Sequence, residues 1–187
     1  MSNTNAPFGF RPVRRIGGGE IAMTEYTIAS GYTVSLFTGD AVMMSGTSNN
    51  IKQAPATTTN AIGIFAGCVW TDSTGIHWSP YWPASQTSTT TVKAYVYDDP
   101  MLVMWAQADA TTTAEIGVQV DYTVGSGSTA TGLSASYAVV SGKTDTTGKP
   151  FKVMRLAPKP GNTTGSYAIV ELTWASHSML VGGPGVS

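Results

Sequence analysis

The chain has 187 residues, of which 42% are hydrophobic and only 11% are charged, with a formal net charge of −1. This length suits one domain with a full hydrophobic core, and the composition excludes a disordered acidic or basic protein. The near-zero charge gives no general electrostatic attraction to nucleic acid or to an anionic membrane surface. Because few charges keep neighbours apart, such a surface suits a chain that works packed in an assembly.

Cysteine usage and hydropathy lead to expectations about the compartment. Cys68 is the only cysteine, which excludes an intrachain disulfide, and its apolar neighbours predict a buried residue rather than a reactive thiol. The N-terminal segment lacks the charged-then-apolar pattern of a signal peptide, and no apolar run reaches the roughly 18 residues that span a bilayer. We therefore expect a soluble protein that is made in a reducing cytoplasm and has no membrane partner.

Residues 1–19 are predicted to form an extended N-terminal arm. Prolines and a run of three glycines at 17–19 are incompatible with a regular helix there. The arm interleaves apolar and basic side chains, which are Phe8, Phe10, Arg11, Val13, Arg14, Arg15 and Ile16. Ordering this segment costs more entropy than burial of its apolar side chains returns, so we expect it to pair with a sheet edge of its own chain or of a partner. The alternative is a flexible tail.

Residues 20–187 are predicted to form a single β-rich domain, because short apolar runs alternate with turn signals along them. The expected strands lie at 20–32, 35–45, 61–70, 87–99, 101–109, 137–140, 151–161 and 166–180. A threonine run and Glu115 favour a short helix at 111–120. The fold class is therefore mainly β: a compact β-barrel or β-sandwich-like body with an extended N-terminal arm and at most one or two short helices.

The runs 35–45 and 61–70 organise this body. Both are apolar and β-prone, and they flank a polar span of small residues. We expect them to form the central strand pair of a small, sharply curved barrel. Gly39, Gly63 and Gly67 interrupt the two runs, and glycine inside a strand pattern indicates a bulge, a bend or a close backbone approach.

An aromatic, turn-rich segment follows at residues 71–85. Trp78, Tyr81 and Trp82 lie within five positions of one another, next to two prolines. This pattern favours a loop whose rings cover the barrel or face a partner. Stacking of the rings on a sugar is the alternative interpretation.

The sequence offers no catalytic site or metal site that we consider convincing. Asp72 and His77 are close enough to pair, but a loop histidine stacked among aromatic rings is the favoured interpretation. His177 is the only other histidine, and it adds no metal-ligand spacing. Asp98 and Asp99 point to opposite faces of a strand, so a turn-capping role is favoured over acid–base chemistry. We predict a non-enzyme with no cofactor, no metal and no small-molecule substrate.

Several segments together resemble structural proteins of tailed bacteriophages. They are NAPFGFRPVRRIGGG, FTGDAVMM, AIGIFAG, EIGVQVDYTVGSGSTATGLSAS, PFKVMRL and GNTTGSYAIVELTWASH. In particular, the chain resembles the capsid decoration (cement) proteins of the outer head surface, although many of these are smaller. The resemblance implies a virion protein, often trimeric, that clamps junctions between major capsid protein subunits without contacting nucleic acid. Its arm would then contact the capsid through Phe8, Phe10, Arg11, Arg14 and Arg15.

Two other functions remain open from the sequence. One is another virion structural role or a carbohydrate-binding adhesin module at the head or tail, with Trp78, Tyr81 and Trp82 as the recognition surface. The other is a hydrolase of cell-wall polymer that uses Asp72 and His77. Of the three functions, capsid cementing is the one we expect.

Overall fold

The two apolar runs that flank the polar span pair with each other. In the computed structural model, β4 (Ala41–Met44) is antiparallel to the start of β6 (Ala61–Asp72), which confirms the expected central strand pair. The structure describes all residues except 1–2, 47, 87–90, 112–114, 146 and 181–187. The fold is mainly β, as predicted, and the described residues contain no α-helix.

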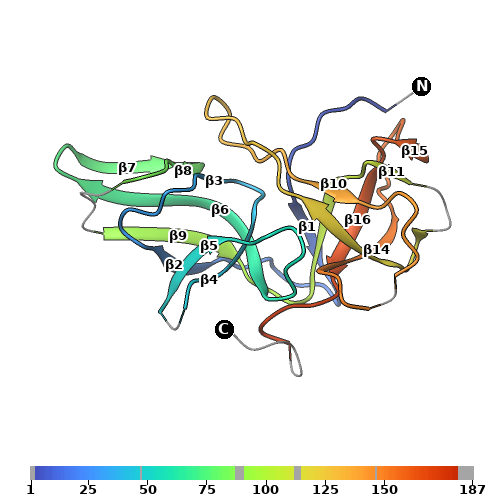
Figure 1. Ribbon diagram of the computed structural model, residues 1–187, viewed down its shortest axis with the longest axis horizontal. Helices are drawn as coiled ribbons and strands as arrows, with labels where there is room; N and C mark the ends of the chain where they lie inside the picture. The colour runs from blue at the N-terminus through green and yellow to red at the C-terminus, as the bar shows by residue number, and fades with distance from the viewer. Residues whose placement is uncertain (1–2, 47, 87–90, 112–114, 146, 181–187) are drawn as a thin grey trace.

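Most strands before residue 100 form a six-stranded sheet. Its order is β4, β5 (Asn50–Gln53), β2 (Thr24–Ile28), β9 (Thr91–Tyr97), β6 and β7 (Gly75–Ser79). The additional β4–β6 pairing closes a five-stranded barrel and leaves β7 as an edge strand outside the closure (Figure 1). A short ladder of β3 (Leu36–Phe37) and β8 (Tyr81–Trp82) lies beside β6. We call this half of the molecule the barrel.

The glycines of β6 allow the sharp curvature of the barrel. A Cβ atom at Gly63 would lie 2.4 Å from the carbonyl oxygen of Tyr97, so only glycine lets these two strands approach so closely. Gly67 has φ +132° and lies next to the register shift between β6 and β9. Both observations agree with the expected close approach and bulge. The interior is packed with buried apolar side chains, including Leu36, Val42, Ile62, Phe65, Val96 and Trp82.

The second half of the molecule is an open six-stranded sheet, which we call the open sheet. Its order is β1 (Arg11–Arg15), β10 (Leu102–Gln107), β16 (Ile169–Trp174), β14 (Phe151–Leu156), β12 (Gln119–Thr123) and β13 (Tyr137–Val139). A short ladder of β11 (Ala110–Thr111) and β15 (Gly165–Ser166) adjoins it. One face packs on a core that includes Met104, Tyr122, Phe151, Val153 and Leu172.

The N-terminal segment is part of the open sheet rather than a separate arm. Strand β1 pairs antiparallel with β10 of the same chain, so the sheet edge that the segment was expected to need is its own. Phe10 is 1% exposed, and its ring lies 4.4 Å from that of Phe151 and 5.4 Å from that of Tyr122. Within the segment 1–19 that was expected to form the arm, β1 therefore completes the edge of the sheet and Phe10 is part of its core.

The barrel contributes side chains to the core of the open sheet. Ala41, Ala61 and Ile64 lie on barrel strands but belong to the core of the open sheet. After β16, the chain returns to the barrel, where the Ser178 N–H donates to the carbonyl oxygen of Ala61 at 3.1 Å. Figure 1 shows this return at the C-terminal end of the chain.

Three local expectations need correction. The polar span between the central strands, where no strand was expected, contains β5. This strand pairs with β4 and β2 and buries its one apolar side chain, Ile51. Residues 71–85 form a hairpin of β6 with β7, followed by β8, instead of a loop. Part of the expected helix at 111–120 lies outside the described residues, and β12 already begins at Gln119.

Candidate interaction surface

The outer face of the open sheet gathers basic side chains from strands that are far apart in the sequence. In an antiparallel sheet, residues directly opposite each other project to the same face. One row of such partners runs across four strands through Arg11, Trp105, Glu171 and Arg155. A second row runs through Arg14, Val103, Thr173 and Lys152. We call Arg11, Arg14, Lys152, Arg155 and the Glu171 between them the cationic face.

Two β-bulges bring Arg14 and Arg155 to this face. Strict alternation would place Arg14 on the face opposite Arg11, and Arg155 opposite Lys152. The register shifts between Pro12 and Arg14, and again between Val153 and Arg155. Each extra residue reverses the side-chain direction that follows, as bulges commonly do. The basic composition of the face is therefore a product of these two bulges.

Glu171 holds the cationic face together at its centre. The residue is 2% exposed, and its Oε2 accepts hydrogen bonds from Arg14 at 3.1 Å and from Arg155 Nε at 2.7 Å. Its Oε1 accepts from Arg155 at 3.2 Å and from the indole N–H of Trp105 at 3.2 Å. Burial acts to raise the pKa of Glu171, but the three donors outweigh it and hold the pKa below the ordinary value. The carboxylate is thus ionised, and both arginine side chains are fixed on the sheet.

The structure separates the five predicted capsid-contact residues. Phe8 and Arg11 remain at the surface, where the Arg11 guanidinium carbon lies 5.2 Å from the centre of the Phe8 ring. Arg14 is on the same face and bonds to Glu171, with its side chain 41% exposed. Phe10 is a core residue, and Arg15 pairs with Asp99 away from the cationic face. Only three of the five residues therefore lie together on an accessible surface.

Sequence reasoning did not identify the rest of the cationic face. Lys152, Arg155, Trp105 and Glu171 come from three strands whose register cannot be seen in a single sequence. One signal was present: Glu171 is the only charged residue of β16, and a lone acid in an apolar strand needs a buried partner. That signal indicates a cation nearby, but it does not say which one.

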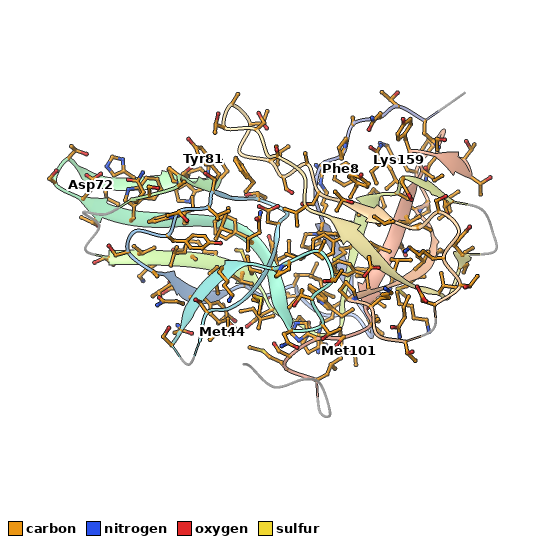
Figure 2. The ribbon with its side chains drawn as sticks, viewed as in Figure 1. Phe8, Met44, Asp72, Tyr81, Met101 and Lys159 are labelled. Atoms are coloured by element: carbon orange, nitrogen blue, oxygen red, sulfur yellow. The ribbon has the colours of Figure 1, made fainter. Side chains whose placement is uncertain are left out.

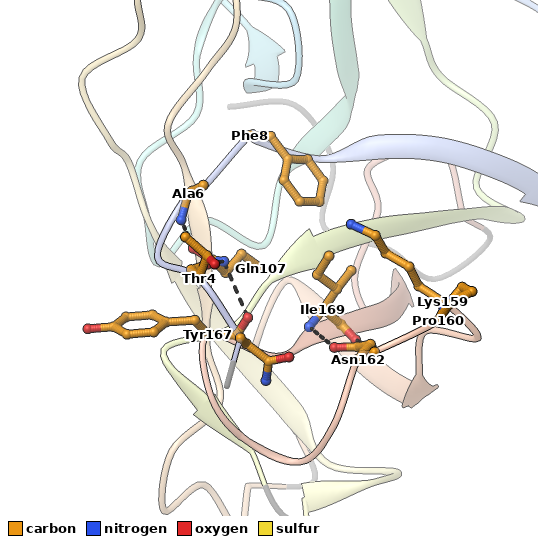
Figure 3. A pocket seen from close by; sticks show the side chains of 11 residues that line it. Thr4, Ala6, Phe8, Gln107, Lys159, Pro160, Asn162, Tyr167 and Ile169 are labelled. Atoms are coloured by element: carbon orange, nitrogen blue, oxygen red, sulfur yellow. Dashed lines mark hydrogen bonds between the residues drawn. The ribbon is translucent and has the colours of Figure 1, made fainter. Parts of the chain in front are cut away.

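A pocket of about 330 Å³ adjoins the cationic face where β10 ends and β16 begins (Figure 3). Its wall includes Phe8 and Ala6 on one side and Lys159 on the other, as Figure 3 shows, and Figure 2 labels Phe8 and Lys159 in the whole molecule. Gln107 holds the N-terminal wall in place. Its Oε1 accepts from the N–H of Ala6 at 3.0 Å, and its Nε2 donates to the carbonyl oxygen of Thr4 at 2.8 Å. The pocket could hold one protruding side chain of a partner next to the cationic face.

The three aromatic residues of the 71–85 segment do not form one platform. Trp82 is fully buried and packs edge-to-face on Trp70, with ring centres 5.5 Å apart. Tyr81 stacks on Phe37 at 5.5 Å, whereas Trp78 is 70% exposed. A sugar-binding surface of all three rings is therefore not present, and Trp78 alone keeps an open ring face.

Asp72 and His77 do pair, but not in the arrangement that hydrolysis needs. His77 Nε2 lies 3.0 Å from Asp72 Oδ1 and 2.9 Å from the Thr74 hydroxyl, so the acid and the hydroxyl contact the same ring nitrogen. A catalytic triad instead places the nucleophile and the acid on different nitrogens. Hydrogen bonds from Thr74 and then from His77 lower the pKa of Asp72 to about 2. The His77 ring stacks on Trp70 rather than on the aromatic residues that follow it.

The remaining candidates have structural roles. Asp99 Oδ1 accepts from the Met101 N–H at 2.8 Å, as expected of a turn cap, while Asp98 accepts from the hydroxyl of Tyr26 at 2.9 Å. Cys68 is buried, as predicted, and burial raises the pKa of its thiol to about 12. His177 is also buried, and burial lowers its pKa.

The described residues include no candidate metal centre and no candidate membrane helix. No group of three or more His, Cys, Asp or Glu side chains there is placed to hold a metal ion. No helix in the same residues is long and apolar enough to cross a membrane. Comparison with protein-family models, with curated proteins and with solved structures found no match for the chain. The cationic face and its pocket are therefore the leading candidate site on physical grounds.

Proposed function

We propose that the protein is a non-catalytic virion protein that binds the outside of a phage capsid and stabilises junctions between major capsid protein subunits. The sequence resemblance motivates this function, and the cationic face is the observation that carries it. In a chain with a net charge of −1, four basic side chains share one sheet face with a buried carboxylate, which binds two of them. Such a face fits an acidic surface on a neighbouring protein.

The binding mechanism would combine charge with a small apolar anchor. Arg11, Lys152 and Arg155 present cations at the surface, while the Phe8 ring and the adjacent pocket provide an apolar contact beside them. Because Glu171 fixes Arg14 and Arg155, little side-chain entropy would be lost when a partner binds. If the protein is a trimer, as the resemblance implies, three such faces would bind one shell with a high effective concentration.

Removal of the whole N-terminal segment is a poor test of this function, because Phe10 belongs to the core and β1 is a strand of the open sheet. We choose instead Arg11→Glu combined with Lys152→Glu, two outer-face residues that do not contact Glu171. The variant should remain folded but bind undecorated phage heads at least about ten-fold more weakly, because it presents anions to an acidic surface. Cosedimentation with purified heads measures the binding.

The matched control carries the same change in net charge on the barrel. Lys52→Glu combined with Lys93→Glu lies on β5 and β9, away from the cationic face. The control should decorate heads as well as the native protein does. The proposal is wrong if the cationic-face variant still decorates heads normally, or if both variants lose binding equally.

A carbohydrate-binding role is the second candidate, and the exposed ring of Trp78 is the observation that favours it. One exposed tryptophan can stack on a sugar ring, although the other two predicted aromatic residues do not lie beside it. Trp78→Ala should then abolish glycan binding on an array of cell-surface saccharides. Absence of any glycan binding by the native protein would exclude this candidate.

A further inference from the structure

Strand β7 is a free edge of the barrel sheet and carries two strongly exposed apolar side chains. Ile76 is 78% exposed and Trp78 is 70% exposed, more than any other large hydrophobic residue that the structure describes. The two residues alternate with His77, so they share one face of the strand. In the described part of the chain, β6 is the only strand that pairs with β7. Proteins usually protect such an edge, because it can pair with another chain.

The register of the β6–β7 hairpin shows which backbone groups of β7 do not bond to β6. Asp72 and Gly75 flank a two-residue turn and form the closing pair, which exchanges backbone hydrogen bonds. The hydrogen-bonded pairs then recur at every second residue, so His77 also bonds to β6. The N–H and C=O groups of Ile76 and Trp78 consequently point away from β6, toward the open edge.

We propose that β7 pairs antiparallel with β7 of a second copy of this chain, about a two-fold axis that passes by His77. Ile76 and Trp78 lie symmetrically about His77, so in this register Ile76 of each copy lies opposite Trp78 of the other. Each such pair can exchange two backbone hydrogen bonds with the groups that point to the edge. The four apolar side chains then cover one another on a single face, as cross-strand aliphatic and aromatic pairs commonly do.

The local chemistry suits a second copy. The edge strand has no Asp, Glu, Lys or Arg from 75 to 79. The cross-strand partners of Ile76 and Trp78 on β6 are Thr71 and Val69, which are also uncharged. Two copies can therefore approach without like-charge repulsion. Pro80, which has no N–H, limits the ladder at one end, and the hairpin turn limits it at the other. The contact joins copies in pairs and does not depend on capsid binding, and a three-fold ring would need another surface.

Disulfide trapping tests the register directly. In the proposed pairing, His77 faces His77 of the other copy across a non-hydrogen-bonded pair, at a Cα distance of about 4.5 Å that suits a disulfide. His77→Cys should therefore form a covalent dimer under oxidised glutathione, seen on a non-reducing gel. The only native cysteine, Cys68, is buried and should give little background.

Ser73→Cys is the matched control, because Ser73 is exposed in the hairpin turn and its two copies would lie roughly 25 Å apart. Random collision should cross-link this exposed thiol at least as fast as the one at position 77, whereas the proposed pairing should cross-link only position 77. Equal rates at the two positions, or no dimer at position 77, would overturn the proposal and leave the edge to a different partner.

A second variant tests the contribution of the apolar pair. Trp78→Lys in the His77→Cys background should slow dimer formation at least about ten-fold, because an edge lysine opposes strand pairing. Met23→Lys, at another exposed apolar residue, is the control and should leave the rate unchanged. An unchanged rate with Trp78→Lys would contradict the proposed contact even if a dimer forms.

Discussion

The barrel and the open sheet each contain a buried carboxylate, and they surround it in opposite ways. Asp40 precedes the barrel strand β4 and is 1% exposed. Its carboxylate accepts hydrogen bonds of 2.6–3.3 Å from four uncharged donors, which are the Phe37 N–H, the Gln53 amide, and the Ser134 and Ser136 hydroxyls. Glu171 on β16 is buried to the same degree, but its donors include the guanidinium groups of Arg14 and Arg155. The two sites differ in the charge of their donors more than in their burial.

This difference decides the direction of each pKa shift. Burial raises the pKa of Asp40, because hydrogen bonds from neutral donors do not fully replace the lost solvation of the charge. Burial acts in the same sense on Glu171, yet its bonds from Arg155, Trp105 and Arg14 together lower the pKa. Asp40 thus accepts hydrogen bonds from uncharged groups of both halves of the molecule, whereas Glu171 organises a charged surface.

The largest expected effect comes from removal of the Asp40 side chain. Asp40→Ala leaves two hydroxyl groups, an amide and a backbone N–H without their acceptor inside the molecule. We expect the free energy of unfolding to fall by about 3 kcal/mol, as measured by urea denaturation. Asp40→Asn keeps one acceptor oxygen and should cost less, so an equal loss in both variants would contradict this account.

A smaller effect is expected at Glu171. Glu171→Gln removes the charge between Arg14 and Arg155, but these side chains are 41% and 53% exposed and can be solvated. The free energy of unfolding should fall by about 2 kcal/mol, again in urea. Glu25→Gln is the control, because Glu25 forms an exposed ion pair with Lys93 and should give no measurable change. A loss of equal size at Glu25 would show that burial of Glu171 is not the reason.

The smallest expected effect is a difference in pH dependence. The raised pKa of Asp40 means that stability should fall as the pH rises from the ordinary value of 3.8 through the higher pKa of the folded state. The lowered pKa of Glu171 has the opposite consequence, because its contribution is present above the ordinary value of 4.5 and is lost as the pH falls through the folded-state pKa. Urea unfolding between pH 3 and pH 7 measures both.

Substitution separates these two contributions. Asp40→Asn should reduce the loss of stability that occurs as the pH rises above 3.8. Glu171→Gln should reduce the loss that occurs as the pH falls below 4.5. If both variants change the profile in the same direction, the proposed contrast between neutral and charged donors is wrong.

Much of the fold could be predicted from local patterns. The apolar runs around Val42 and Ile64 indicated the central strand pair, and Gly63 and Gly67 indicated its bends. Strand β5 was missed because only Ile51 in it is apolar and buried, so its pairing depends on neighbours that are distant in sequence. The β7 hairpin was missed because its glycine and the nearby prolines are typical of loops, although its aromatic residues are typical of strands.

The candidate site was predicted only in part. Phe8, Arg11 and Arg14 were named from the N-terminal segment, but Phe10 in the same pattern proved to be a core residue. Whether a side chain in a short apolar and basic segment points inward depends on where a bulge falls, and the bulge between Pro12 and Arg14 depends on pairing with β10.

By itself, the sequence determined that this chain is β-rich and poor in charge, and that Cys68 is buried. These properties follow from composition and from short-range alternation of apolar residues. Only the tertiary structure decided that β1 belongs to the open sheet and that Arg11, Arg14, Lys152 and Arg155 share a face with Glu171. It also decided that β7 is an edge strand, which pairs with β6 alone among the described residues. Strand register is the physical reason, because a shift of one residue turns each side chain to the other face and register is set by partners far away in the chain.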